Sequence, residues 1–301
     1  MTSVLLTGAT GLVGTRLIPL LEARDHDVRW LSRRAGKDPR GLVWNGREPP
    51  AGAVADATAV VHLAGKPIFG GLPTAAQRRE IFDSRVESTR GIVDAMAALP
   101  EAQRPEFFLC ASAVGYYRDG GDDPLSEEAP PGDDFTSELC CAWEQEALRA
   151  EALGIRTVRL RIGVVLAGEG GALATMRIPF MLGLGGPLGS GEQWFPWIHI
   201  DDLCAVIRNA VEDPRYRGAI NAVAPNPVRN AELTRALAGE LHRPAFLRVP
   251  AFALRALLGP LAGELLGSRR VVPTRLSELD FAHAYPTLEG ALAAELGPDR
   301  D

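Results

Sequence analysis

Three glycines near the start of the chain have the spacing of a phosphate-binding turn. Gly8, Gly11 and Gly14 follow the apolar residues 4–6 and precede an amphipathic stretch over residues 15–23. A strand, a tight turn and a helix start are therefore expected. Gly8 can take backbone angles that a side chain forbids, Gly11 lets the main chain approach a pyrophosphate, and Gly14 lets the helix pack on the strand. The turn predicts a dinucleotide site, because free N–H groups at a helix start stabilise an anion; an ordinary β-α turn is the alternative.

The end of the next predicted strand indicates which dinucleotide binds. Residues 27–34 end in Ser32, Arg33 and Arg34, with no acidic residue between Val28 and Arg34. NAD-binding units place a carboxylate at this strand end for the ribose 2′-hydroxyl, whereas NADP-binding units supply positive charge for the 2′-phosphate. A charge-assisted hydrogen bond to phosphate contributes about 1.5–3 kcal/mol. We therefore predict NADP, contacted by Ser32 and Arg33; the alternative is that the arginines only solvate a loop.

Two further strands end in residues that suit a bound ligand. Residues 59–65 close on Leu63, Ala64 and Gly65, and small side chains there would let a cofactor lie against the backbone. Residues 107–112 end in Ser112, and doubly wound sheets bind ligands outside the carboxyl ends of their strands. The Ser112 hydroxyl could hydrogen-bond a carbonyl or an alcohol that is reduced or oxidised. A serine that caps the turn is the alternative.

Strands and helical patterns alternate along the first half of the chain, which indicates an α/β fold. We expect a Rossmann-type doubly wound parallel sheet in residues 1–166, to which residues 199–225 return. Residues 167–301 are expected to form a smaller C-terminal substrate-side region. Within it, residues 168–197 are rich in glycine and show little periodicity, which predicts a long loop that shapes the substrate site. Trp194 and Trp197 either line that site or fill the core. Further helices are expected from Thr74 and over 136–153, and further strands over 42–44 and 157–166.

The composition limits the partners and the compartment. The chain has 301 residues, 46% hydrophobic side chains and a formal net charge of -6, which fits one large or two smaller globular domains. A mild acidic excess without a basic block predicts neither nucleic acid nor a membrane as the main partner. The four cysteines have no metal-ligand spacing, so no metal site is predicted. Free thiols and an N-terminus without signal-peptide features predict a cytoplasmic protein.

Seven segments together resemble one family along nearly the whole chain. The family is an atypical extended branch of the short-chain dehydrogenase/reductases, the epimerase-family group that includes nucleoside-diphosphate-sugar epimerases, with a C-terminal region of unknown function. The resemblance implies a Rossmann fold and an NADP-dependent oxidoreductase or epimerase that acts on a carbonyl or secondary alcohol, for example of a nucleotide sugar. The matching segments are residues 7–14, 63–65, 112–117, 143–144, 161–166, 185–191 and 197–202.

The resemblance also implies roles for individual residues. Beside the three glycines, the cofactor contacts it predicts are Thr7, Leu12 and Val13, and Arg85 on the helix that begins after Thr74 is expected to reach towards the cofactor. The substrate is a small molecule whose identity the sequence does not specify. A homodimer is compatible with the family.

The usual catalytic pair of this superfamily is absent. Its members use a tyrosine and a lysine four residues later, and the lysine lowers the pKa of the phenol. The chain has two lysines, Lys37 and Lys66, and neither follows a tyrosine at that spacing. The corresponding helix offers Cys140 and Glu144 instead.

Three other groups could replace this pair. We predict that Ser112, Tyr116 and Glu144 carry the catalytic chemistry. A protein that binds NADP(H) without turnover, as a sensor or regulator, is the alternative hypothesis.

Overall fold

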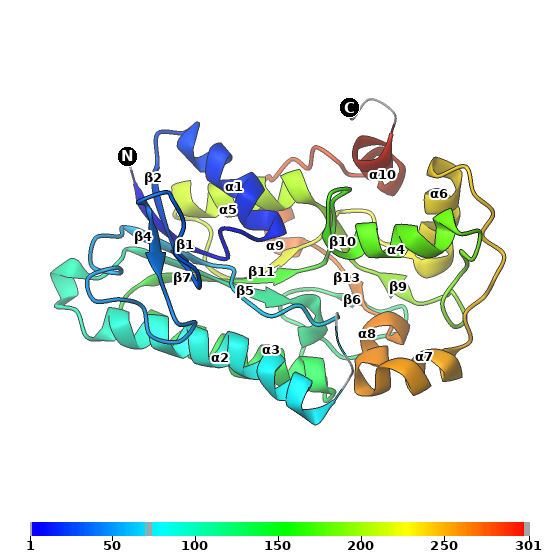
Figure 1. The fold of residues 1–301 in the computed structure, drawn as a ribbon, viewed down its shortest axis with the longest axis horizontal. Helices are drawn as coiled ribbons and strands as arrows, with labels where there is room; N and C mark the ends of the chain where they lie inside the picture. Colours follow the sequence, from blue (N-terminus) through cyan, green and yellow to red (C-terminus); the bar gives the residue numbers. More distant parts are fainter. Residues whose placement is uncertain (1, 70, 72–73, 298–301) are drawn as a thin grey trace. The chain divides into compact units, whose positions relative to one another are not determined.

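The protein was studied as a computed structural model, in which residues 2–69, 71 and 74–297 are described (Figure 1). Contacts divide the chain into two compact units. The first contains Met1–Ser112, Leu139–Arg161 and Cys204–Ile220. The second contains Ala113–Glu138, Ile162–Leu203 and Asn221–Asp301. The domain boundary at residues 166 and 167 stays a prediction.

A seven-stranded sheet forms the centre of the first unit. Its order is β11-β7-β5-β4-β1-β2-β3, and the pairs β1–β2, β1–β4, β2–β3 and β4–β5 are parallel. The order reverses at β1 and β4, and a doubly wound sheet binds its ligands at such a reversal. The Rossmann-type prediction is confirmed. The strands are β1 (Ser3–Thr7), β2 (Asp27–Ser32), β3 (Gly41–Val43), β4 (Ala59–His62), β5 (Phe107–Ala113), β7 (Arg156–Ile162) and β11 (Gly218–Ala222).

Helices cover both faces of this sheet. Figure 1 shows α1 (Leu12–Glu22) and α5 (Ile200–Glu212) on one face, and α2 (Ala75–Ala97) and α3 (Phe135–Glu151) on the other. The central strands are consequently buried on both sides and consist of apolar runs, as parallel strands usually do. The helix expected from Thr74 is α2, and Thr74 is its N-cap residue, since its side chain accepts a hydrogen bond from the Gln77 N–H at 3.1 Å. A short 3-10 helix, Glu101–Gln103, precedes β5.

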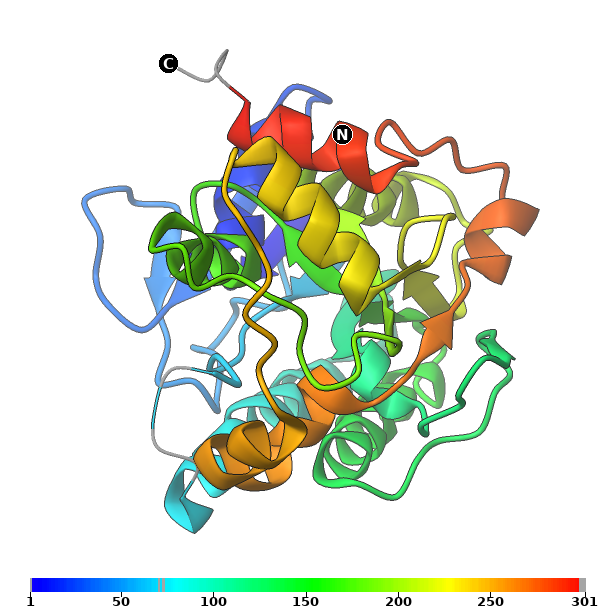
Figure 2. The ribbon, with the colours of Figure 1, turned by 90° about the vertical axis from the view of Figure 1, so that its right-hand side faces the viewer.

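The second unit is built from short strand pairs and short helices. A buried cluster around Trp197 holds part of it together, with Leu166, Phe180 and Leu292 among its members. Figure 2 shows α6 (Asn230–Glu240) and α10 (Leu288–Leu296) side by side. The strand pairs are β8 (Val164–Leu166) with β10 (Trp197–His199), β9 (Trp194–Phe195) with β12 (Val228–Arg229), and β6 (Pro124–Leu125) with β13 (Arg270–Val271). The α-helices are α4 (Gly171–Met181), α6 (Asn230–Glu240), α7 (Ala251–Leu258), α8 (Gly263–Leu266), α9 (Thr274–Glu278) and α10 (Leu288–Leu296), and the 3-10 helices are Val114–Tyr116 and Gly259–Ala262.

Two predicted elements differ from the structure. Residues 168–197 are not one long loop, because they contain α4; its flanking glycines and the internal Pro179 hide a run of good helix formers such as alanine, leucine and methionine. The strand predicted over 157–166 is two strands that break at Gly163. A Cβ at Gly163 would lie 3.0 Å from the Pro196 carbonyl oxygen and 3.0 Å from a Val223 methyl group, so only glycine fits this crossing easily.

The two tryptophans have separate roles. Trp197 is 1% exposed and fills the core of the second unit. Trp194 is half-buried, and its indole N–H donates to Asp122 at 2.8 Å. Over the described ranges, no helix has both the length and the apolar character to cross a membrane.

Candidate functional site

The glycine turn between β1 and α1 is shaped by three close approaches. Gly8 has a φ of +78°, and a Cβ there would lie 3.0 Å from the Leu63 carbonyl carbon at the end of β4. A Cβ at Gly14 would overlap the Gly8 carbonyl oxygen and the Ala9 backbone. Gly11 is the N-cap residue of α1, and neither a side-chain cap nor an acidic residue occupies the first turn. The first N–H groups of α1 therefore suit an external anion such as a pyrophosphate.

A buried hydrogen-bond chain ties this turn to β4. The Thr7 hydroxyl oxygen accepts from the backbone N–H groups of Leu63 and Ala64, at 3.2 and 3.1 Å. It also lies 2.6 Å from Nδ1 of His62, whose Nε2 lies 3.0 Å from the Ser88 hydroxyl. Thr7 and His62 are fully buried. The backbone of residues 63–64, where a cofactor contact is predicted, is thus held by the side chain of Thr7.

The pattern of donors fixes the tautomer of His62. Because the Thr7 oxygen already accepts two N–H groups, its own proton points to Nδ1 of His62. Nε2 then carries the ring proton and donates to Ser88, which donates in turn to the carbonyl of Ser84 or Arg85. Burial first, and the nearby charge of Arg85 second, lower the pKa of His62 to about 3. His62 is therefore neutral over the physiological range.

Arg85 contacts the backbone beyond β4. Its Nη1 donates to the Lys66 carbonyl at 2.8 Å, and a Cβ at Gly65 would lie 3.2 Å from its guanidinium carbon. The guanidinium also lies over the Trp143 ring, 5.3 Å from the ring centroid. Burial lowers the pKa of Arg85, and Cys140 opposes that shift. Arg85 therefore places a positive charge directly against the predicted cofactor segment 63–65.

The end of β2 carries positive charge without a competing acid. Arg33 and Arg34 are exposed, and the Ser32 hydroxyl accepts from the Arg34 N–H at 3.4 Å. Asp38, the next acidic residue, is engaged by Arg40, whose Nε donates to it at 3.0 Å. In the described part of the chain, no ion pair joins Arg33 or Arg34 to a carboxylate. The charge at this strand end is therefore available to an anionic ligand.

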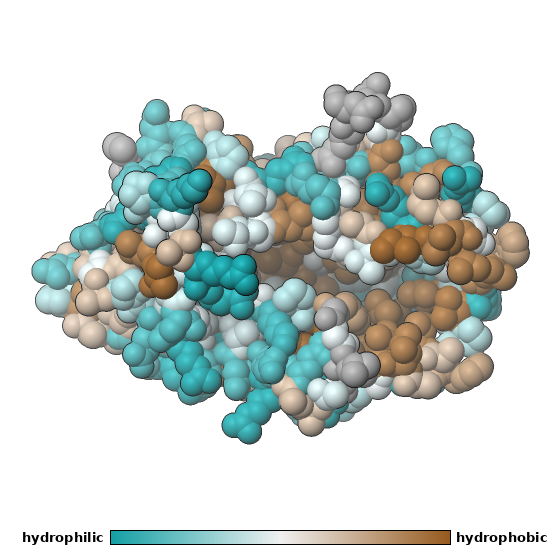
Figure 3. Space-filling view, viewed as in Figure 1, coloured by the Kyte–Doolittle hydropathy of each residue, from teal (hydrophilic) through white to brown (hydrophobic). Residues whose placement is uncertain are grey.

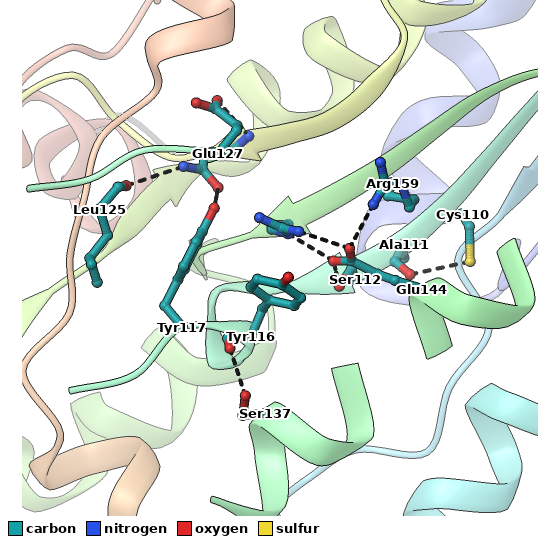
Figure 4. Close-up of polar contacts among 12 residues, drawn as sticks. Cys110, Ala111, Ser112, Tyr116, Tyr117, Leu125, Glu127, Ser137, Glu144 and Arg159 are labelled. Carbon is teal, nitrogen blue, oxygen red and sulfur yellow. Dashed lines mark hydrogen bonds and ion pairs between the residues drawn. The ribbon is translucent and has the colours of Figure 1, made fainter. Parts of the chain in front are cut away.

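Ser112 and Glu144 come together in the first unit, although 32 residues separate them. The Ser112 hydroxyl donates to Glu144 Oε1 at 2.7 Å, and Figure 4 shows the Glu144 carboxylate between Ser112 and Arg159. Arg161 donates to both carboxylate oxygens, from Nε at 2.8 Å and from Nη2 at 2.9 Å. Arg159 Nη1 adds a bond of 3.2 Å. Glu144 is therefore a buried carboxylate held by two guanidiniums and one hydroxyl.

The two arginines are site residues that the sequence reasoning missed. They stand at positions i and i+2 of β7, so both side chains leave the same face of the strand, where α3 carries Glu144. Arg161 is 2% exposed. A signal was available in the apolar run 157–166, because an arginine buried in such a strand requires a carboxylate partner.

Tyr116 belongs to the second unit. Its ring is half-buried, and its carbonyl accepts from the Ser137 hydroxyl at 2.7 Å (Figure 4). The neighbouring Tyr117 is fully buried and donates its phenol proton to Asn221 Oδ1 at 2.6 Å. Of the two phenols, Tyr116 is thus the more accessible. No group of His, Cys, Asp and Glu side chains among the described residues could hold a metal ion.

Two family models match the chain. The NAD dependent epimerase/dehydratase family matches residues 4–222, and a domain of unknown function, DUF1731, matches residues 249–295. The epimerase family protein SDR39U1 homolog, chloroplastic, of Arabidopsis thaliana is 42% identical over 97% of this chain and 86% of its own length. Human epimerase family protein SDR39U1 is 38% identical over 96% of this chain and 98% of its own length. The location that the Arabidopsis name gives is the chloroplast, and a cytoplasmic location of this chain stays a prediction.

Solved structures show the same fold. Human SDR39U1 (isoform 2) in its crystal structure with NADPH has a TM-score of 0.88 and 34% identity, over 98% of this chain and 99% of that one. The nucleoside-diphosphate sugar epimerase of Corynebacterium glutamicum has a TM-score of 0.81 and 35% identity, over 98% of this chain and 58% of that one. A UDP-N-acetylglucosamine 4-epimerase from Bacillus cereus, with a TM-score of 0.76 and 17% identity, shares the fold over 99% of this chain and 97% of its own.

Glu144→Gln is expected to destabilise the first unit. The change removes the charge that faces Arg159 and Arg161 and leaves the buried guanidinium of Arg161 uncompensated, which costs about 3–5 kcal/mol in comparable cases. Urea unfolding followed by tryptophan fluorescence measures the loss. Glu138→Gln, at the exposed start of the same helix, is the matched control and should cost well under half as much. Equal midpoints for the two variants would contradict the assigned role of the carboxylate.

His62→Asn is expected to make the free energy of unfolding depend less on pH on the acid side of neutrality. The amide oxygen of asparagine can still accept from Thr7, but it cannot titrate. In the wild type the unfolded chain binds a proton below the ordinary histidine pKa of 6.5, whereas the folded chain resists it down to about pH 3. Stability is therefore lost as the pH falls through this window, by up to about 1.4 kcal/mol per pH unit. The free energy of unfolding is measured for wild type and variant between pH 7.5 and pH 5. The difference between the two proteins should shrink as the pH falls. A difference that stays constant would refute the assignment of His62 as a neutral buried side chain.

Proposed function

The chain belongs to the NAD dependent epimerase/dehydratase family, and on this premise we propose that it binds NADP(H) in its first unit and acts as an oxidoreductase or epimerase on a carbonyl or secondary alcohol. The observation that carries the proposal is the pairing of the Gly8–Gly14 turn with an acid-free, arginine-bearing end of β2. The NADPH in the crystal structure of human SDR39U1 supports the choice of cofactor. A nucleotide sugar is one substrate class of this proposal.

Each predicted cofactor residue has a distinct task in this proposal. The N–H groups of Leu12, Val13 and Gly14 at the start of α1 bind the pyrophosphate, and Gly8 and Gly11 let it approach. Ser32 and Arg33 bind the 2′-phosphate. Bound NADP(H) supplies the hydride chemistry.

A second set of residues supports the cofactor from β4. The backbone of Leu63, Ala64 and Gly65 lies along it, and Thr7 fixes that backbone through two N–H bonds. Arg85 adds positive charge against the same segment through its contact with Gly65.

The catalytic proposal rests on Ser112, Tyr116 and Glu144. Because the Ser112 proton points to Glu144, the Ser112 oxygen presents lone pairs that can accept a hydrogen bond from a substrate alcohol. Glu144 acts through Ser112 and is a positioning residue in this scheme. In the direction of reduction, the phenol of Tyr116 is proposed to give its proton to the carbonyl oxygen as the hydride arrives, and the hydroxyl so formed then donates a hydrogen bond to Ser112.

A specific observation favours the rival function, a sensor that binds NADP(H) without turnover. The carboxylate of Glu144 is satisfied by Ser112, Arg159 and Arg161 within the protein, and no Tyr-x-x-x-Lys pair exists in the sequence. Such a network stabilises a fold without needing a substrate. Cofactor binding is common to both functions, whereas turnover separates them.

NADPH is expected to bind more tightly than NADH in calorimetric titrations of the full chain. Loss of the charge-assisted contact in Arg33→Asp should reduce NADPH affinity by roughly 10- to 150-fold and leave NADH affinity nearly unchanged. Arg217→Asp, the same change at an exposed position elsewhere in the first unit, is the matched control. Retention of the NADPH preference in the Arg33 variant would refute the assignment of this residue, and failure of both dinucleotides to bind would refute the nucleotide site.

Turnover is expected when the NADPH- or NADP-loaded protein is screened against carbonyls, secondary alcohols and nucleotide sugars. Nicotinamide absorbance reports net hydride transfer, and product analysis reports epimerisation. Ser112→Ala should lower the rate by about 10²-fold or more, because the substrate oxygen loses the hydrogen bond that orients it for proton exchange with Tyr116. Ser126→Ala is the matched control. A chain that binds NADPH but stays silent across the panel would favour the sensor.

A further inference from the structure

Large exposed apolar side chains gather in two segments of the second unit. Among the described residues, ten large hydrophobic side chains are exposed, and eight of them fall in residues 178–184 and 246–257. The most exposed are Phe246 and Phe252, each at 74%. The other six are Ile178, Met181, Leu182, Leu184, Leu247 and Leu257. We call these eight residues the apolar surface.

Backbone contacts bring the two segments together. The N–H of Leu247 donates to the Gly185 carbonyl at 3.1 Å, and the N–H of Val249 donates to Pro187 at 3.0 Å. A Cβ at Gly186 would overlap the Leu247 carbonyl. Figure 2 shows the chain between α6 and α7 as an extended segment, and Figure 3 shows apolar side chains over α4 and near α7 on one face. The apolar surface is therefore one feature built from two segments.

Within the two stretches that carry the apolar surface, the charged side chains are all arginines, and Glu169, Glu192, Glu240 and Glu264 lie at their outer ends. Residues 170–191 and 241–263 contain Arg177, Arg243, Arg248 and Arg255 but no aspartate or glutamate. All four arginines are exposed. The whole chain, in contrast, has a formal net charge of -6. These two stretches thus combine exposed apolar side chains with a cationic border in an otherwise acidic protein.

We propose that the apolar surface docks on an anionic lipid bilayer, with Phe246, Phe252 and Leu257 inserted among the lipids and the arginines at the phosphate level. Surface-bound segments of membrane proteins show this combination of bulky apolar and basic residues. Each basic residue near an anionic bilayer contributes electrostatic attraction that salt screens. The prediction of no membrane partner rested on the net charge of the whole chain. That value averages over local differences in charge, so it does not detect a cationic surface in an acidic protein. We therefore depart from that prediction here.

Two features favour a bilayer over a protein partner. In a two-fold symmetric dimer the same surface meets itself, which would place the arginines of one copy against those of the other. Residues 178–184 and 246–257 also contain no neutral polar side chain, whereas a protein interface usually carries about one hydrogen bond per 100–200 Å². A bilayer needs apolar insertion and phosphate contacts, and these segments supply both.

Co-sedimentation of the full chain with vesicles tests the proposal. Vesicles of phosphatidylcholine mixed with phosphatidylglycerol are compared with vesicles of phosphatidylcholine alone, at low and at raised salt. The chain should sediment with the anionic vesicles and be released by salt. Phe252→Ser combined with Leu257→Ser should weaken binding by at least about tenfold, and Arg255→Glu should weaken it by roughly tenfold.

Matched controls distinguish binding through the apolar surface from nonspecific hydrophobic or electrostatic adsorption to the vesicles. Val43→Ser removes an exposed apolar side chain outside this surface, and Arg217→Glu makes the same charge change elsewhere; neither should alter vesicle binding. All substituted positions are exposed, and thermal melts check that each variant is folded. Equal binding to both vesicle types, or no binding to either, would overturn the proposal. A dimer in light scattering that the Phe252/Leu257 variant abolishes, without vesicle binding, would assign the surface to a second copy instead.

Discussion

The first unit depends on the close approach of the β1–α1 turn to the end of β4. Gly8 has no space for a side chain against Leu63, and the Thr7 hydroxyl holds the Leu63 and Ala64 N–H groups. The two lone pairs of this hydroxyl accept these two bonds, and its own proton is donated to the neutral ring of His62. The backbone proposed to receive a dinucleotide is thus positioned by hydrogen bonds that lie entirely within the protein.

The second constraint is the burial of charge beneath α3. Glu144 is 4% exposed and would be costly there without Arg161. Because the carboxylate also accepts from Ser112, the orientation of that hydroxyl follows from the placement of two arginines on β7. The side chain proposed to meet the substrate and the ion pairs that stabilise the unit therefore belong to one network.

The sequence predicted local features well and long-range partners poorly. The Gly8–Gly14 turn, the Thr74 cap and the parallel strands follow from neighbouring residues, so periodicity and turn chemistry were sufficient. The partner of Glu144 lies on another element, and α4 was hidden because glycines and Pro179 interrupt its pattern. The Asp202 carboxylate likewise accepts the N–H groups of Ala284 and Tyr285, more than eighty residues later. Such pairings depend on the tertiary fold and leave no local signal.

The residues on α3 at the spacing of the usual tyrosine–lysine pair differ from that pair in charge. A tyrosine and a lysine four residues later would place one positive charge on this helix, whereas the chain has Cys140 and Glu144 at that spacing. The carboxylate alone would invert the charge. Arg159 and Arg161 contribute two positive charges, and Glu151, whose Oε1 lies 3.8 Å from Arg159 Nε, contributes a second negative one, so the four side chains have no net charge. The positive charge that the lysine would supply is therefore not retained by this group. The Cys140 thiol is only 2% exposed, and the phenol proposed for proton exchange, that of Tyr116, lies outside α3. Glu144 contributes to this scheme through its hydrogen bond with Ser112.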